Sequence, residues 1–159
     1  MGIRQSPYWG RDFAMNFDDR HLKLAVDICK ANNVKLYLTM NTLVKNNELR
    51  SFFDQLSYAY SAGIDAVIIQ DISLIDIIKK NYPDLRIHIS TQSGVMNSGY
   101  IRSLNNIDRV TLARELTSSE IADIKKNNKC EIHRSNQVNN SESSNILLCL
   151  FGNNLRKYF

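Results

Sequence analysis

The sequence predicts an α/β fold in which parallel strands alternate with crossover helices. Three observations lead to this prediction: helical and strand patterns alternate along the chain, the strand segments are nearly continuous in apolar residues, and each ends in a polar cluster. Alternating strands and helices are typical of parallel sheets with right-handed crossovers. Strands that are apolar throughout are typical of sheets covered on both faces. The 159 residues suffice for one domain with its own core.

Five helices are predicted from apolar stripes and from helix-terminal signals. The first stripe consists of Leu22, Ala25, Val26 and Cys29, which recur at helical spacing. Gly63 stands where the second helix needs a left-handed C-terminal residue. The letters "TSSE" at 117–120 form a capping box that opens the fifth helix. In chain order, helices are expected over about 18–32, 49–62, 74–80, 96–104 and from 117 onward.

Five strands are predicted between these helices. They cover 34–42, 65–71, 85–92, 108–115 and a segment beginning at 130–132. Parallel strands place their carboxyl ends at one edge of the sheet, and ligands of such folds bind at that edge. The polar clusters "TMNT", "QD", "STQ" and "ARE" are therefore expected to share one rim. The alternative for each cluster is an ordinary strand-to-loop junction, which is polar because loops are wet.

The rim supplies amide side chains for substrate binding. Asn41, Gln70 and Gln92 each follow a strand closely and would orient a polar substrate. His88 precedes Ser90 by two residues on one strand, but serine–histidine catalysis also needs an orienting acid. A hydrogen-bonded histidine inside a barrel is therefore the preferred interpretation of His88.

The rim also supplies charged side chains. Asp71 and Glu115 are the candidate catalytic acid and base, and either would also bind a cation. Arg114 would hold a carboxylate or phosphate in a bidentate pair. A structural ion pair between Arg114 and Glu115 is an equally open interpretation.

Composition excludes several classes of protein. The net charge is +4 with the Lys and Arg residues scattered, so a dense nucleic-acid patch is not predicted, although RNA stays open. No run approaches the roughly 20 apolar residues of a membrane span, so no membrane partner is expected. Cys29, Cys130 and Cys149 lack metal-ligand spacing, so no metal site is predicted. An odd cysteine count favours a reducing cytoplasm.

Four motifs, in this order and spacing, carry a family resemblance. They are "NTLV" at 41–44, "QD" at 70–71, "STQ" at 90–92 and "ARELT" at 113–117. The chain from about Arg11 to Ile132 resembles peptidase family U32, the collagenase-like proteases. The resemblance implies that residues 11–132 form part of a TIM-like (β/α) barrel. It also implies a substrate-binding role for Arg11, which matches a recurrent arginine of the family.

The resemblance implies more than one activity. The family name implies hydrolysis of peptide bonds. Other members are linked to hydroxylation of RNA bases or of a quinone precursor, and some carry an iron–sulfur cluster on cysteines that follow the barrel strands. Residues 133–159 do not match that cysteine segment, so no cofactor is expected. This Asn- and Ser-rich tail is expected to be poorly ordered. Peptidase, hydroxylase and non-catalytic remnant therefore remain open.

An incomplete barrel has consequences for stability and partners. A TIM barrel takes roughly 200 residues or more, so about half of one is expected here. Its two open sheet edges would favour self-association. Ile68, together with Ile87 or Ile89, is expected on the inner face without a full set of apolar neighbours. Peptide or RNA is the expected substrate.

Overall fold

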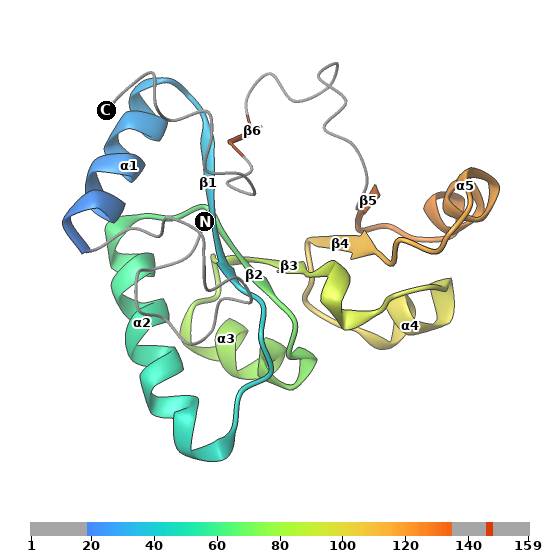
Figure 1. Cartoon of the computed structure of the whole chain (residues 1–159), viewed down its shortest axis with the longest axis horizontal. Coiled ribbons are helices and arrows are strands. Elements are labelled where there is room, and N and C mark those ends of the chain that lie inside the picture. The colour runs from blue at the N-terminus through green and yellow to red at the C-terminus, as the bar shows by residue number, and fades with distance from the viewer. Residues whose placement is uncertain (1–18, 135–145, 148–159) are drawn as a thin grey trace.

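A parallel sheet organises the protein. The computed structural model describes residues 19–134 and 146–147. The strand order is β5-β4-β3-β2-β1-β6, and every pair is parallel (Figure 1). The predicted α/β class with parallel strands and crossover helices is confirmed. The strands are β1 (Lys35–Met40), β2 (Ala66–Ile69), β3 (Arg86–Ile89), β4 (Arg109–Leu112), β5 (Glu131–Arg134) and β6 (Ile146–Leu147).

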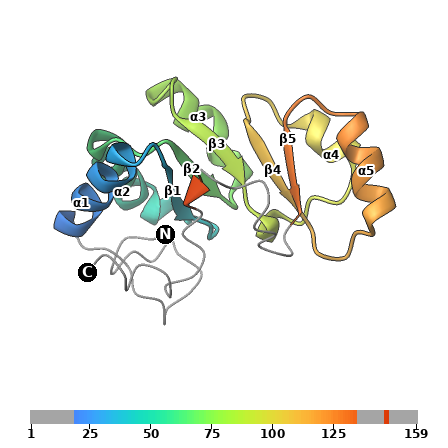
Figure 2. The ribbon, with the colours of Figure 1, turned by 90° about the horizontal axis from the view of Figure 1, so that it is seen from above.

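A helix follows each of the first four strands, and a further helix precedes β1. In the view of Figure 2, α1 and α2 lie to the left of the strands, α3 above them and α5 to the right. Gly63 ends α2 in the left-handed conformation, with φ of 96°, as its position in the sequence predicts. The helices are α1 (Asp19–Ala31), α2 (Leu49–Ala62), α3 (Ile75–Asn81), α4 (Ser98–Ser103) and α5 (Ser118–Lys126), and three 3-10 turns are η1 (Asn46–Glu48), η2 (Ile72–Leu74) and η3 (Thr91–Ser93).

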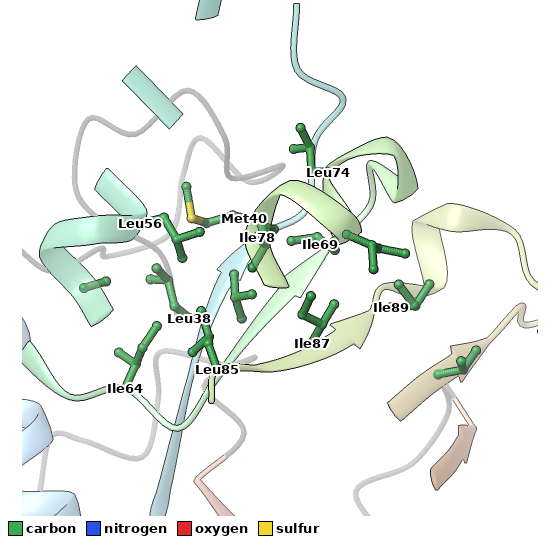
Figure 3. Packing of buried hydrophobic residues seen from close by; sticks show 14 of the residues in the cluster. Leu38, Met40, Leu56, Ile64, Ile69, Leu74, Ile78, Leu85, Ile87 and Ile89 are labelled. Atoms are coloured by element: carbon green, nitrogen blue, oxygen red, sulfur yellow. The ribbon is translucent and has the colours of Figure 1, made fainter. Parts of the chain in front are cut away.

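The hydrophobic core lies between the helices and one face of the sheet. Leu38, Leu56 and Ile78 are among the side chains that meet there (Figure 3). Ile87 and Ile89 are fully buried in this core. The expectation that one of them lies on the inner face is therefore wrong, because alternate residues of a strand point to opposite faces. Ile68 is half-buried and lies on the opposite face, where the prediction places it.

The sheet curves strongly. The guanidinium carbon of Arg109 on β4 lies 5.2 Å from the ring centroid of Tyr37 on β1. Three strand spacings separate β1 from β4, which amounts to about 14 Å in a flat sheet. Contact between side chains of these strands favours a sheet that bends toward the face opposite the helices. An open, curved parallel sheet of this kind agrees with a partial barrel.

Part of the chain that the sequence assigns to the tail belongs to the sheet. In β6, Ile146 and Leu147 pair with Lys35 and Leu36 of β1. At the other end of the strand order, β5 continues past Ile132 to Arg134. The remainder of the tail lies outside the described residues, so its expected disorder stays a prediction.

The capping box of α5 is confirmed and leads to a stability prediction. The Thr117 hydroxyl accepts a hydrogen bond from the N–H of Glu120, while the Glu120 carboxylate accepts one from the N–H of Thr117. We expect Thr117→Ala to lower the free energy of unfolding by about 1 kcal/mol, because the N–H of Glu120 loses its acceptor, the Thr117 hydroxyl. Chemical denaturation measures this, with Thr117→Ser as the control that keeps the cap. Equal stability of the alanine and serine variants would contradict the assignment.

Candidate functional site at the strand ends and on the inner face

Hydrogen bonds connect the carboxyl ends of three strands along one edge of the sheet. After β3, the Ser93 hydroxyl donates to the carbonyl of Gln70 at 2.9 Å, and the Thr91 hydroxyl donates to the carbonyl of Leu112 at 3.1 Å. The Gln70 amide donates to the carbonyl of Gln92 at 3.3 Å. The predicted strand ends therefore lie side by side, and part of their polar character serves to hold the edge together.

Asp71 serves this edge as a structural carboxylate. Its Oδ1 accepts hydrogen bonds from the N–H and hydroxyl of Ser73, at 3.1 and 2.6 Å. Its Oδ2 accepts one from the N–H of Val44 at 3.2 Å, which ties the loop after β1 to the end of β2. These contacts account for an aspartate at this position. Its role as a catalytic acid or base stays a prediction.

Three predicted site residues are exposed at the same edge. Gln92 lies in η3, and Arg114 and Glu115 form a turn that begins two residues after the end of β4. Asn41 follows β1 and is half-buried. Gln92, Arg114 and Glu115 are therefore the groups that a large substrate would reach. Arg11 lies outside the described residues, so its role is not tested.

A row of five side chains, four of them polar, crosses the face of the sheet opposite the helices, called here the inner face. The register pairs Thr39 with Ile68, Ile68 with His88, His88 with Arg109, and Arg109 with Glu131. These five residues stand at one level on five neighbouring strands. Because side chains alternate between faces, all five point away from the helical core.

Arg109 and Glu131 form the charged end of this row. Nε and Nη2 of Arg109 both lie 2.8 Å from Oε2 of Glu131, and Nε2 of His133 lies 2.9 Å from Oε1. Partial burial of Glu131 opposes its ionisation, but the hydrogen bonds to Arg109 and His133 outweigh this effect and lower its pKa. Glu131 is therefore a carboxylate that orients the guanidinium group.

His88 lies in the middle of the row and is 3% exposed. Its ring meets the ring of Tyr37 edge-on, with centroids 4.6 Å apart. Burial, followed by the positive charge of Arg109, lowers the pKa of His88 to about 4, so the imidazole is neutral near pH 7. Its Nδ1 has no hydrogen-bond partner in the described structure. The predicted inner position is correct, whereas the predicted hydrogen bond is not found at this nitrogen.

Ser90 does not act as a partner of His88. Its hydroxyl accepts a hydrogen bond from the N–H of Gln92 at 3.3 Å and so caps η3. This contact explains the serine at the end of β3 as a turn-forming residue.

Sequence reasoning missed Tyr37, Arg109, Glu131 and His133 as members of a site. The available signal is weak, because Arg109 and Glu131 begin their strands and read as flanking residues. The informative pattern is the alternation of polar and apolar residues in β4, where Arg109 and Thr111 alternate with Val110 and Leu112. Such alternation identifies a polar inner face only once the strand register is known.

The cysteines of the described part do not fit an iron–sulfur cluster. Cys29 of α1 is buried in the core and Cys130 packs against it. Burial raises the pKa of both thiols, which disfavours the thiolate form that binds metals. Among residues 19–134 and 146–147, no group of three His, Cys, Asp or Glu side chains is arranged to hold a metal ion. Cys149 lies outside these ranges.

Comparison with known families identifies the chain. Residues 3–139 match the model of peptidase family U32, a range that extends past both ends of the resembling segment. The chain belongs to peptidase family U32. Within the part that the structure describes, this U32 chain has no helix long and apolar enough to span a membrane.

Several curated relatives resemble this U32 chain. The uncharacterized protease MJ0090 of Methanocaldococcus jannaschii is 37% identical over 73% of the chain and 28% of its own length. The tRNA hydroxylation protein P of Haemophilus influenzae is 31% identical over 69% of the chain and 24% of its own length. A collagenase of Porphyromonas gingivalis is 30% identical over 70% of the chain and 27% of its own length. The chain thus spans about a quarter of these relatives.

A solved structure shares the fold. The U32 peptidase Mk0906 superposes with a TM-score of 0.61 at 19% identity, over 75% of this chain and 53% of that one. At this identity the likeness concerns the fold alone. It agrees with an open sheet that corresponds to part of a larger α/β structure.

Proposed function

We propose that this U32 chain is the RNA-binding part of an enzyme that hydroxylates a base in RNA. The observation that carries the proposal is its 31% identity to the tRNA hydroxylation protein P of Haemophilus influenzae, with 30% identity to the Escherichia coli protein of the same name. The proposal assigns RNA binding to this chain and assigns no redox step to it.

The edge of the sheet at which the carboxyl ends of the strands lie, called here the carboxyl edge, has the groups that RNA binding needs. The exposed Arg114 would contact phosphate, and the exposed amide of Gln92 would contact base edges. The Gln70 side chain and the Asp71 carboxylate hold the backbone of this edge in place. A rigid edge keeps the exposed groups at fixed positions, which favours binding of a defined RNA segment.

Peptide hydrolysis is the second candidate. Its support is the 37% identity to the uncharacterized protease MJ0090 and the 30% identity to the collagenase. In that case the exposed carboxylate of Glu115 would activate a water molecule, and Arg114 would stabilise the developing negative charge. The two candidates therefore use the same edge and differ in substrate.

Two arginines at opposite edges of the sheet provide the test. Arg114 follows β4 at the carboxyl edge, whereas Arg86 begins β3 at the opposite edge, and both are exposed. We expect Arg114→Gln to weaken binding of tRNA to the purified chain about fivefold to tenfold, because one phosphate contact is lost. The salt dependence of the binding constant should also fall by about one unit of slope. Fluorescence anisotropy with labelled tRNA measures both quantities.

Arg86→Gln is the matched control, because it removes the same charge at the other edge. Equal losses for the two variants would mean non-specific attraction and would contradict an RNA site at the carboxyl edge. Cleavage of gelatin that is abolished by Glu115→Gln, without tRNA binding, would support the peptidase candidate instead.

Self-association is a separate proposal for this chain. Among the described strands, β5 stands last in the order and pairs with β4 alone. We infer that its outer edge pairs with another chain, because an open strand edge presents unsatisfied backbone groups. Sedimentation equilibrium tests this, and a monomer at all concentrations would exclude it.

A further inference from the structure

We propose that the inner face of the sheet carries a binding site for a carboxylate group, formed by Arg109 and His88 above the ring of Tyr37. The site is distinct from the carboxyl edge and goes beyond the proposed RNA binding. Two buried nitrogen atoms of this face have no hydrogen-bond partner in the described structure.

The first nitrogen is Nη1 of Arg109. The side chain is 6% exposed, and Nε and Nη2 both donate to Oε2 of Glu131. Nη1 is buried and donates no hydrogen bond. Leaving a donor of a charged group unsatisfied in a buried place is costly, and native structures rarely do so without a functional reason. An acceptor oxygen at Nη1 would remove that cost.

The second nitrogen is Nδ1 of His88. His88 is the register partner of Arg109 on the neighbouring strand, and both side chains contact the ring of Tyr37. The two unpartnered nitrogens therefore belong to side chains that project from the same face at one level of the sheet. As a neutral ring, His88 offers an N–H donor in the tautomer that carries the proton on Nδ1.

Two single donors fit a carboxylate better than a phosphate. A carboxylate is planar and has two oxygens, so one can accept from Arg109 and the other from His88. A phosphate has more oxygens that need partners, and Glu131 already faces the guanidinium group and would repel its second charge. The face of the Tyr37 ring attracts the guanidinium group of Arg109, which lies 5.2 Å from its centroid, and so helps to hold this cation at the site. The ligand class is thus a small organic acid that enters with its carboxylate first.

Acetate is the probe for the experiment, titrated into the isotope-labelled chain at constant ionic strength with chloride as the balancing ion. We expect saturable changes in the nitrogen resonances of both Arg109 and His88. Arg109→Lys should weaken acetate binding about tenfold to a hundredfold, because one charge-assisted hydrogen bond is lost. Arg86→Lys is the matched control, because Arg86 lies on the same face of the sheet but not in the row of Arg109. This variant should leave the affinity for acetate unchanged.

Each outcome decides the proposal. Resonance changes that chloride alone reproduces, or that phosphate saturates at lower concentration than acetate, would overturn it. The titration of the unsubstituted chain remains decisive if Arg109→Lys fails to fold. Arg114→Gln should retain full acetate binding, which separates this site from the RNA-binding edge.

Discussion

Leu56→Ala is expected to lower the free energy of unfolding by about 2–5 kcal/mol, because it opens a cavity in a fully packed core. Leu56 is a residue of α2 and is 0% exposed. Its side chain packs between this helix and the sheet (Figure 3). This loss is a large fraction of the roughly 5–15 kcal/mol that stabilises a domain. Urea denaturation followed by circular dichroism measures it.

Leu24→Ala is the matched control for the core substitution. Leu24 is also a helical leucine, in α1, but it is 45% exposed. Its truncation removes little buried surface and should cost less than about 0.5 kcal/mol. Equal losses for the two variants would contradict the assignment of the core to the face between sheet and helices.

Acidification is expected to destabilise the protein through His88. Its pKa falls from 6.5 in the unfolded chain to about 4 in the folded protein, so the unfolded state alone binds a proton between these values. Above pH 6.5, His88 is neutral in both states and the free energy of unfolding has its full value. As the pH falls toward 4, the free energy of unfolding decreases by roughly 3 kcal/mol.

The surroundings of His88 determine the size of this effect. Burial is the largest cause, the charges of Arg109 and His133 act in the same direction, and Asp108 and Glu131 oppose it. The pKa of Glu131 is also lowered in the folded protein. Protonation of this carboxylate at lower pH therefore decreases the free energy of unfolding further.

Chemical denaturation at a series of pH values tests the prediction for His88. His88→Gln should flatten the curve between pH 4 and 6.5, because it removes the group that binds a proton only in the unfolded state. A steep curve that persists in His88→Gln would show that another group controls the acid response.

Local signals in the sequence predict the elements well. Gly63 and the Thr117 capping box mark helix ends correctly, because backbone conformation and capping bonds depend on neighbouring residues. The shared edge of the strand ends also follows from the alternation of strands and helices, since it requires only that the strands be parallel.

The inner face depends on contacts that the sequence does not reveal. Arg109 meets Tyr37 although their strands are far apart in the chain and are not neighbours in the sheet. Asp71 has the appearance of a catalytic carboxylate, but backbone and hydroxyl donors from two loops surround it. Ile87 and Ile89 are as apolar as Ile68. Only the strand register shows that Ile87 and Ile89 face the helices, whereas Ile68 lies on the opposite face. Tertiary geometry decides each of these cases.

The most direct test of the RNA assignment is mass spectrometry of tRNA nucleosides from source cells in which the coding region of this chain is deleted and then restored. The account predicts that one nucleoside loses a single oxygen atom on deletion. Restoration with the unsubstituted sequence should return that oxygen, and restoration with Arg114→Gln should return less of it. Unchanged tRNA nucleosides, together with loss of gelatin cleavage in the deletion strain, would contradict the account and establish the peptidase candidate.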